Sequence, residues 1–403
     1  MTPATRLRSP AVSADGFRRG DLLYFLMVLV AYVAATALAI EFHGLGLDRM
    51  MIVAEQALHG RLDSSTFQGT VDSVQVGGRY YLALGPLQLA AYLPFAAIPE
   101  LQRVGGYIAG LLFGIPAAWL ALPLVRAYGA KGRAAYWIAG FTAFGSLLFW
   151  TSVFGVPYYL AHAEAFLALS LFLLEWAGKR RPILLGLCLG IAFLARPTIV
   201  LAAIPFGVGL LWARRDELGG MARTGLAFAF PIAGAIALYG WFNWVRFGSV
   251  LESGYSISVL QVPWLQEARA QGLFTPWHIP ANIYFGLLEP PDLTGRFPFL
   301  APDACGMSML LVSPALLTAV YAGFRDRTAR LLWVAAAIVA LPVFLYYGGG
   351  VVQYGFRYSL DFTPFLIALM AMGSGRWTGR RERILVLASI ASVAIGIWWY
   401  ANF

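Results

Sequence analysis

Apolar residues come in long runs along the whole chain, and short polar connections separate these runs. A run of about 18 apolar residues is long enough for a helix to cross the ~30 Å hydrocarbon core of a bilayer. We predict eleven such helices, at residues 21–40, 104–125, 134–153, 158–177, 183–196, 198–213, 224–245, 305–324, 331–347, 360–374 and 384–402. The pattern therefore predicts an all-α polytopic membrane protein in which residues 1–403 form a single transmembrane domain.

Two stretches between the predicted spans are too long to be simple turns. Residues 41–103 follow the first span, and residues 246–304 follow the seventh. The second stretch is rich in Pro, Gly and aromatic residues, whereas disordered linkers lack aromatic residues. We therefore expect it to be an ordered lid or binding loop.

Composition agrees with a membrane protein. The chain is 60% hydrophobic and 12% charged, with a mean hydropathy of +0.70, which excludes an ordinary soluble domain. A basic segment that includes Arg18 and Arg19 precedes the first run, and no small-residue cleavage site follows it. The first run is therefore expected to be a retained span and not a signal peptide.

The net charge of +9 is unevenly distributed along the chain. Most Lys and Arg residues lie in the N-terminal segment and in alternate connections, such as residues 126–133, 178–182 and 376–383. By the positive-inside rule these segments are cytoplasmic. The N-terminus is then cytoplasmic, while the C-terminus and both long stretches face outward, as expected in a bacterial inner (plasma) membrane. No basic face is interleaved with stacking aromatic residues, so no nucleic acid is expected as a partner.

Leu84–Pro99 is also apolar enough to cross a membrane. A crossing there would place every later basic connection outside, against the positive-inside rule. Pro86, Pro94 and Pro99 favour a short, broken helix. We therefore predict an outward-facing juxtamembrane helix that does not cross.

The first outward loop, residues 41–103, combines acidic, basic and aromatic residues. They are Asp48, Glu55, Asp63 and Asp72, together with His43, His59, Arg79 and Tyr80. This composition predicts a chemical site at the membrane surface. Asp48, Ile52 and Glu55 are predicted to share one face of a helix. Asp48 is a candidate general base or metal ligand, and the alternative is a solvated carboxylate.

Charged residues also stand at the outer ends of later spans. His162 and Glu164 lie at the mouth of the span 158–177, and Arg196 precedes the helix-breaking Pro197. Arg357 precedes the span 360–374 in the same way. A charge at that depth needs a partner, so each arginine is a candidate anion ligand or part of a structural ion pair.

In chain order, these segments resemble a known family. They are Asp48 with AEQALHGRL, then GRYYLALGPLQLAAYLP, Glu164, GLCLGIAFLARPT, NWVRFGSVLESGY and YGFRYSLDFTPFL. The chain resembles membrane glycosyltransferases of the GT-C class, which include polyprenyl-phosphate-sugar-dependent protein mannosyltransferases and lipid A sugar transferases. The order and spacing carry the resemblance, since no single motif is diagnostic.

The resemblance implies an inverting transfer of a sugar from a polyprenyl-phosphate donor to an acceptor hydroxyl. The acceptor is a glycan, lipid or protein of the cell envelope, at the outer face of the membrane. Asp48 is implied as the general base, Glu164 as a second catalytic acid, and Arg196 as the phosphate contact. Arg357 is a further candidate for that contact.

Other residues complete the candidate site. Arg79, Tyr80, His162 and His278 are candidate substrate ligands, although His278 can equally be a structural hydrogen-bond partner. Many relatives have a second acid beside the first, whereas Arg49 follows Asp48 here. Mg²⁺ or Mn²⁺ bridging Asp48 and Glu164 is still conceivable, because carboxylates suit these ions.

Two other functions fit part of the pattern. A transporter or flippase of a lipid-linked precursor also needs outward carboxylates and arginines, but it should carry charges near mid-span. A scaffold without enzymatic activity in an envelope-assembly complex is the second alternative.

Overall fold

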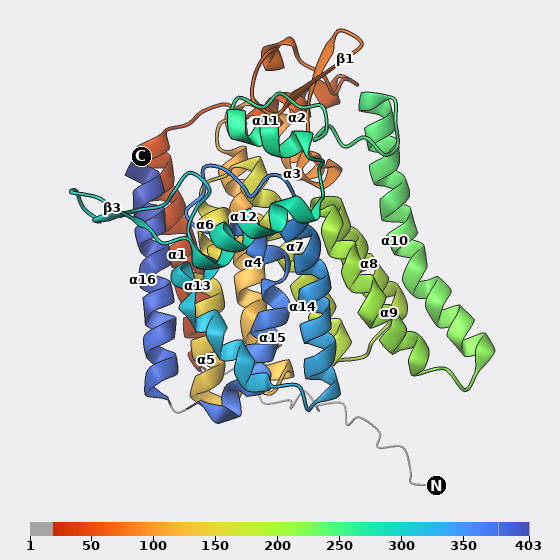
Figure 1. The fold of residues 1–403 in the computed structure, drawn as a ribbon, viewed down its shortest axis with the longest axis vertical. Coiled ribbons are helices and arrows are strands. Elements are labelled where there is room, and N and C mark those ends of the chain that lie inside the picture. The colour runs from red at the N-terminus through yellow and green to blue at the C-terminus, as the bar shows by residue number, and fades with distance from the viewer. Residues whose placement is uncertain (1–18, 378, 403) are drawn as a thin grey trace.

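The computed structural model describes residues 19–377 and 379–402. The predicted cytoplasmic N-terminal segment before Arg19 lies outside the described residues. The helices form an upright bundle, and the long loops cover one end of it (Figure 1). This arrangement is the predicted all-α polytopic architecture with juxtamembrane elements on one side.

Within the described ranges, six helices are long and apolar enough to cross a membrane. They are α1 (Arg19–His43), α4 (Gly105–Ala127), α7 (Pro157–Ala177), α10 (Leu218–Phe247), α14 (Arg327–Leu345) and α16 (Arg380–Asn402). A bent unit makes a seventh candidate, with a 42° change of direction between its two parts. It consists of α5 (Gly132–Gly140), the π-helix η3 (Phe141–Gly145) and α6 (Leu147–Val153). These seven units match seven of the eleven predicted spans.

The other four predicted spans are shorter or broken. They correspond to α8 (Pro182–Ala195), to η4 (Pro197–Ala202) with α9 (Ala203–Trp212), to α13 (Met309–Val312) with η7 (Pro314–Ala322), and to η8 (Arg357–Asp361) with α15 (Thr363–Gly373). Proline removes a backbone donor and clashes with the preceding turn, and Pro197 and Pro314 stand where these units are interrupted. A helix of 11 residues such as α15 extends only about 17 Å. The number of crossings, eleven, therefore stays a prediction.

The first outward loop holds two short helices and a β-hairpin. Its elements are α2 (Arg49–Leu58), η1 (Ser65–Phe67), β1 (Ser73–Val76), β2 (Arg79–Leu82), α3 (Pro86–Ala96) and η2 (Pro99–Leu101). α3 lies at the loop-bearing end of the bundle (Figure 1), and its 11 residues are too few to cross. Leu84–Pro99 thus forms the predicted juxtamembrane helix.

The hairpin is a departure from the all-α prediction. β1 and β2 pair antiparallel through a two-residue turn at Gly77 and Gly78, whose φ angles are 57° and 76°. Such a turn needs positive φ at both positions, which glycine adopts without strain. Glycine pairs flanked by strand-forming residues are the sequence signal for this turn.

The second outward loop is ordered, as predicted from its aromatic content. It contains α11 (Pro263–Ala270), η5 (Pro276–His278), α12 (Ile279–Ile283), the π-helix η6 (Tyr284–Leu288), and the strands β3 (Asp292–Leu293) and β4 (Leu300–Ala301). The two loops meet, because Asp72 N–H donates to Val259 O at 2.9 Å and Val259 N–H donates to Ser73 O at 2.8 Å. At the opposite end, η9 (Ser374–Arg376) leads toward α16.

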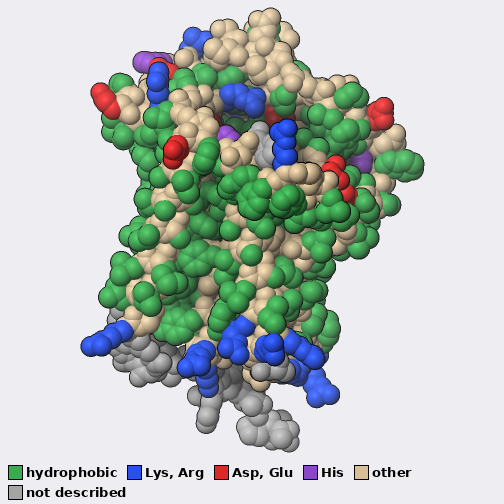
Figure 2. Space-filling model, turned by 90° about the vertical axis from the view of Figure 1, so that its left-hand side faces the viewer, with side chains coloured by type: hydrophobic (Ala, Val, Ile, Leu, Met, Phe, Trp, Pro, Cys, Tyr) green, Lys and Arg blue, Asp and Glu red, His purple; other side chains and the backbone are tan. Residues whose placement is uncertain are grey.

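Acidic and basic side chains are distributed unequally between the two ends of the molecule. On the face in Figure 2, Lys and Arg side chains crowd the end opposite the loops, and hydrophobic side chains cover the middle. The Asp and Glu side chains lie toward the loop-bearing end, where further Lys and Arg side chains are also present. α16 also ends at the loop-bearing side (Figure 1). The asymmetry is the one that the positive-inside rule uses, and the cytoplasmic side stays a prediction.

Candidate functional site

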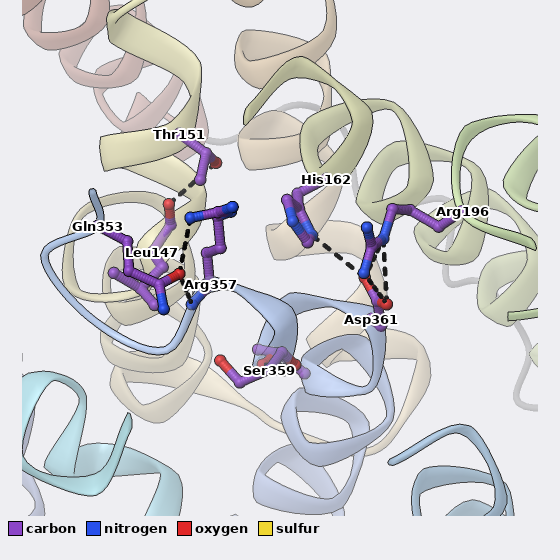
Figure 3. A network of polar contacts seen from close by, with 9 residues as sticks. Leu147, Thr151, His162, Arg196, Gln353, Arg357, Ser359 and Asp361 are labelled. Atoms are coloured by element: carbon purple, nitrogen blue, oxygen red, sulfur yellow. Dashed lines mark hydrogen bonds and ion pairs between the residues drawn. The ribbon is translucent and has the colours of Figure 1, made fainter. Parts of the chain in front are cut away.

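A buried ion pair joins segments that are far apart in the chain. Arg196 stands where α8 ends before Pro197, and Asp361 stands at the end of η8. The Arg196 guanidinium donates to both Asp361 oxygens, through Nε at 3.1 and 3.2 Å and through Nη2 at 2.9 Å. His162, in α7, places Nδ1 3.2 Å from Asp361 Oδ1 (Figure 3). Asp361 therefore holds Arg196 and His162 in fixed positions.

The Arg196 side chain stays partly accessible in this ion pair. Its side chain is 21% exposed, whereas the Asp361 side chain is fully buried. Asp361 engages Nε and Nη2. No hydrogen bond found within the described ranges uses Arg196 Nη1, so this group is available to a ligand.

Arg357 lies close to this ion pair but is bonded to other residues (Figure 3). Its Nη1 donates to Gln353 Oε1 at 2.9 Å and to Val351 O at 3.3 Å (Figure 3). The residue is only 7% exposed, and its Nε has no hydrogen-bond partner in the described part of the chain. A buried guanidinium with an unused donor has the chemistry of an anion receptor.

Tyr358 lies between the two arginines. The guanidinium carbon of Arg196 is 4.7 Å from the centre of the Tyr358 ring, and that of Arg357 is 5.1 Å from it. The His162 ring is 5.5 Å from the same ring, centre to centre. Two arginines and a histidine thus surround one aromatic ring, with Asp361 as their carboxylate neighbour. We call Arg196, Arg357, His162, Tyr358 and Asp361 the cationic cluster.

Glu164 belongs to a different polar group. It is 1% exposed and accepts a hydrogen bond from Gln88 Nε2 of α3, while its Oε1 has no partner among the described residues. The nearby Tyr92, also in α3, donates its hydroxyl to Gly155 O at 2.9 Å. Burial raises the pKa of Tyr92 well above its usual value, and the charges of Asp48 and Glu164 raise it further. The negative charges of both candidate catalytic acids therefore act on the Tyr92 hydroxyl.

Asp48 stands before α2 as its N-cap, and not on the face of that helix as predicted. Its carboxylate accepts a hydrogen bond from Met50 N–H at 2.6 Å, which satisfies one of the free donors of the first turn. Burial raises the pKa of Asp48 to about 6, although Met50 N–H and the Arg49 guanidinium act to lower it. A carboxylate with such a pKa is mostly ionised at neutral pH and is still basic enough to accept a proton.

The remaining candidates lie elsewhere. Arg79 is exposed at the start of β2, and Tyr80 is half-buried in the same strand. His278 is buried in the second loop, where its Nε2 lies 2.8 Å from Gly272 O. Among the described residues, no hydrogen bond, ion pair or ring contact joins these three residues to the cationic cluster.

The structure brings in residues that the sequence reasoning did not assign. Gln88 binds Glu164, and Asp361 pairs with Arg196. Gln88 had a signal that was missed, since it is the one strongly polar side chain in the apolar stretch Leu84–Pro99.

A metal site is not evident from the side chains. No group of three or more His, Cys, Asp or Glu residues in the described chain is placed to hold a metal ion. Asp48 and Glu164 alone provide two carboxylates. Mg²⁺ bound there would need water or phosphate oxygens to complete its shell.

No protein-family model matches the sequence, and no curated protein matches it by sequence. The crystal structure of ArnT from Cupriavidus metallidurans bound to undecaprenyl phosphate is similar in fold, with a TM-score of 0.51 and 14% sequence identity. The similarity covers 90% of this chain and 61% of that one, so this chain spans about three fifths of that chain's length. The likeness confirms the predicted GT-C fold.

Proposed function

We propose that this protein is an inverting glycosyltransferase that uses a polyprenyl-phosphate sugar as donor. The acceptor is a hydroxyl group of an envelope glycan, lipid or protein, and transfer takes place at the outer face of the membrane. The observation that carries the proposal is Arg357, a buried arginine with an unused Nε, beside Arg196, which has an unused Nη1. Two such groups suit the phosphate of a lipid donor.

The fold comparison supports the same class of donor. The similar GT-C structure is of a protein bound to undecaprenyl phosphate. A polyprenyl tail needs a hydrocarbon environment, and its phosphate needs cationic partners near the membrane surface. The cationic cluster lies near the loop-bearing end of apolar helices and meets the second requirement.

The proposed reaction is a single displacement at the anomeric carbon. Asp48 takes the proton of the acceptor hydroxyl, and the acceptor oxygen forms a bond to the anomeric carbon. The bond between that carbon and the phosphate oxygen breaks, and polyprenyl phosphate leaves with the electron pair. Arg357 and Arg196 stabilise the charge that develops on the phosphate. Attack opposite the leaving group inverts the anomeric configuration.

The two arginines have unequal support as phosphate ligands. Arg196 already neutralises Asp361, so part of its charge is balanced. Among the described residues, the Arg357 guanidinium donates hydrogen bonds only to the side-chain amide oxygen of Gln353 and the backbone carbonyl oxygen of Val351. We therefore propose Arg357 as the principal phosphate contact and Arg196 as the second one.

The function is tested by mass spectrometry of envelope glycans, glycolipids and glycoproteins from cells with and without the protein. We expect one sugar-sized mass increment to disappear without the protein and to return with the wild-type chain, but not with Asp48→Asn. An unchanged profile, together with movement of a labelled lipid precursor across vesicles that contain the purified protein, would instead establish the transporter alternative.

A further inference from the structure

One part of the second outward loop has its polar residues inside and its apolar residues outside. It consists of η5, α12 and η6, and we call these residues, 276–288, the α12 segment. His278, Asn282 and Gly286 recur every four residues and are buried. The large exposed side chains of the segment are apolar or aromatic, namely Trp277, Ile283, Tyr284 and Leu288. A helix on a water-covered surface shows the opposite pattern.

Hydrogen bonds to the end of α14 fix the inward direction of the polar residues. Asn282 Nδ2 donates to Phe344 O at 2.9 Å and to Tyr346 O at 2.7 Å. The carbonyls in the last turn of a helix have no partners within that helix, so Asn282 supplies what they lack. Just before the segment, Thr275 N–H donates to Leu345 O at 2.9 Å. The apolar side chains on the opposite face of the segment are therefore directed away from the protein.

The other end of the α12 segment is fixed as well. Ser308 Oγ donates to Leu287 O at 2.7 Å, and Ser308 N–H donates to Glu289 O at 3.0 Å. The segment is thus bonded to the protein at both ends. It cannot turn its apolar face inward without breaking these bonds.

The sequence of this stretch is unusual for an exposed loop. Residues 273–288 read LFTPWHIPANIYFGLL and contain no Asp, Glu, Lys or Arg. α11, in the same loop, contains Glu267 and Arg269, and Glu267 is exposed. A contiguous exposed apolar surface marks contact with a membrane or with another protein.

The depth of the α12 segment favours the membrane. α14 has 19 residues and is therefore about 28 Å long, close to the ~30 Å of the hydrocarbon core. Arg327 begins α14 at the basic end of the molecule, so Leu345, its last residue, lies near the other edge of the core. Leu341, one turn earlier, is exposed on the apolar surface of α14. The α12 segment runs across this end of α14 (Figure 1) and continues that surface.

We propose that the α12 segment lies in the membrane interface at the loop-bearing end, with Trp277, Ile283 and Leu288 in contact with lipid. Trp277 and Tyr284 then occupy the boundary region in which Trp and Tyr are enriched. Helices with one apolar face lie in this region parallel to the membrane plane. The second outward loop is divided accordingly, because α11 faces water and the α12 segment faces lipid.

Nitroxide labels test this placement without any substrate. Single cysteines are introduced by Ile283→Cys and Leu288→Cys in a full-length chain without its native cysteines, and the labelled proteins are reconstituted in phosphatidylcholine vesicles. Leu341→Cys is the reference for lipid and Glu267→Cys the reference for water. Oxygen concentrates in lipid, whereas a water-soluble nickel chelate is excluded from it. We expect the ratio of oxygen to nickel collisions at Ile283 and Leu288 to lie near that at Leu341 and well above that at Glu267.

Two results would overturn the proposal. A ratio equal to that at Glu267 would show that the segment faces water. Loss of collisions with both reagents would show a protein contact, such as a second copy of the chain.

A second measurement keeps the wild-type chain intact. A photoactivatable phosphatidylcholine is incorporated into the same vesicles, and cross-linked peptides are found by mass spectrometry. We expect lipid adducts in residues 276–288 and in α14, but not in α11, which is the matched control in the same loop. Adducts on α14 with none in residues 276–288 would refute the proposal.

Discussion

Asp48 and Asp361 are both carboxylates at the loop-bearing end, yet their surroundings suit them to different tasks. Asp361 is fully buried and bound by a guanidinium and an imidazole. Such a carboxylate is a fixed counter-charge. Asp48 is half-buried and accepts one backbone hydrogen bond, so its remaining lone pairs can receive a proton. The predictions for these two residues differ accordingly.

For Asp48 we predict a dependence of activity on pH. Its pKa is raised to about 6 by burial, and only the ionised form accepts a proton from the acceptor hydroxyl. kcat/KM should therefore be constant at neutral pH and fall as pH decreases through about 6. Asp48→Asn should lower turnover by about 10²–10⁴-fold and remove this dependence. Single-turnover transfer measured above and below that pH tests this dependence. If the Asp48→Asn variant keeps near-normal turnover, Glu55 or Glu164 becomes the candidate general base.

For Asp361 we predict that substitution lowers the stability of the fold. Asp361→Asn leaves the partly buried Arg196 beside a neutral amide, and breaking a buried ion pair on one side costs up to about 3–5 kcal/mol. Thermal unfolding in detergent measures the loss. The matched control is Glu175→Gln, which removes the partner of an exposed arginine, Arg181, and should cost about 0–1 kcal/mol. Equal melting temperatures for the two variants would contradict this role.

Arg196 is tested separately from its partner. If Arg196 also contacts phosphate, then Arg196→Ala should weaken binding of undecaprenyl phosphate in the protein that stays folded, and Arg196→Lys should restore it only in part. A lysine offers a point charge in place of a planar fork. Lower stability with unchanged lipid affinity would limit Arg196 to its pair with Asp361 and leave Arg357 as the phosphate ligand.

At the scale of elements, close helix packing depends on a glycine stripe in α4. Gly106, Gly110 and Gly114 recur every four residues, so they lie on one helical face. A Cβ added at Gly110 would collide with the main-chain oxygen of Ser152 in α6. Small residues of this kind let membrane helices approach closely, and here they hold α6 against α4, beneath the segment that leads to the site.

We therefore predict that Gly110→Ala destabilises the protein by about 1–3 kcal/mol, the usual cost of overpacking. Gly234→Ala is the matched control, because Gly234 lies inside α10 with no atom within 4 Å of the added Cβ. That control should be neutral or slightly stabilising, since alanine favours the helix more than glycine does. Thermal unfolding of both variants gives the answer, and equal losses would show that packing at Gly110 is not tight.

At the scale of the whole molecule, the segregation of charge predicts which end faces outward. The loop-bearing end carries η1 and the end of α16, and the basic end carries the connection between α9 and α10 (Figures 1 and 2). We expect a membrane-impermeant thiol reagent applied to intact cells to label Ser65→Cys and Asn402→Cys in a chain without its native cysteines. Arg215→Cys should react only after the membrane is opened. The reverse pattern would invert the orientation and place the site on the cytoplasmic side.

The local amino-acid sequence determines much of the secondary structure of this protein without reference to tertiary contacts. Hydropathy placed seven units that the structure contains, because the cost of exposing backbone groups to lipid makes each apolar run helical. The break at Pro197 and the juxtamembrane helix within Leu84–Pro99 likewise follow from proline geometry and charge. Tertiary structure decided which polar groups meet. Arg196 and Asp361 are 165 positions apart, and Gln88 and Glu164 are 76 apart, so no periodicity along the chain relates them. A buried charge requires a partner, but only the packing of helices that are distant in the chain determines which residue is that partner.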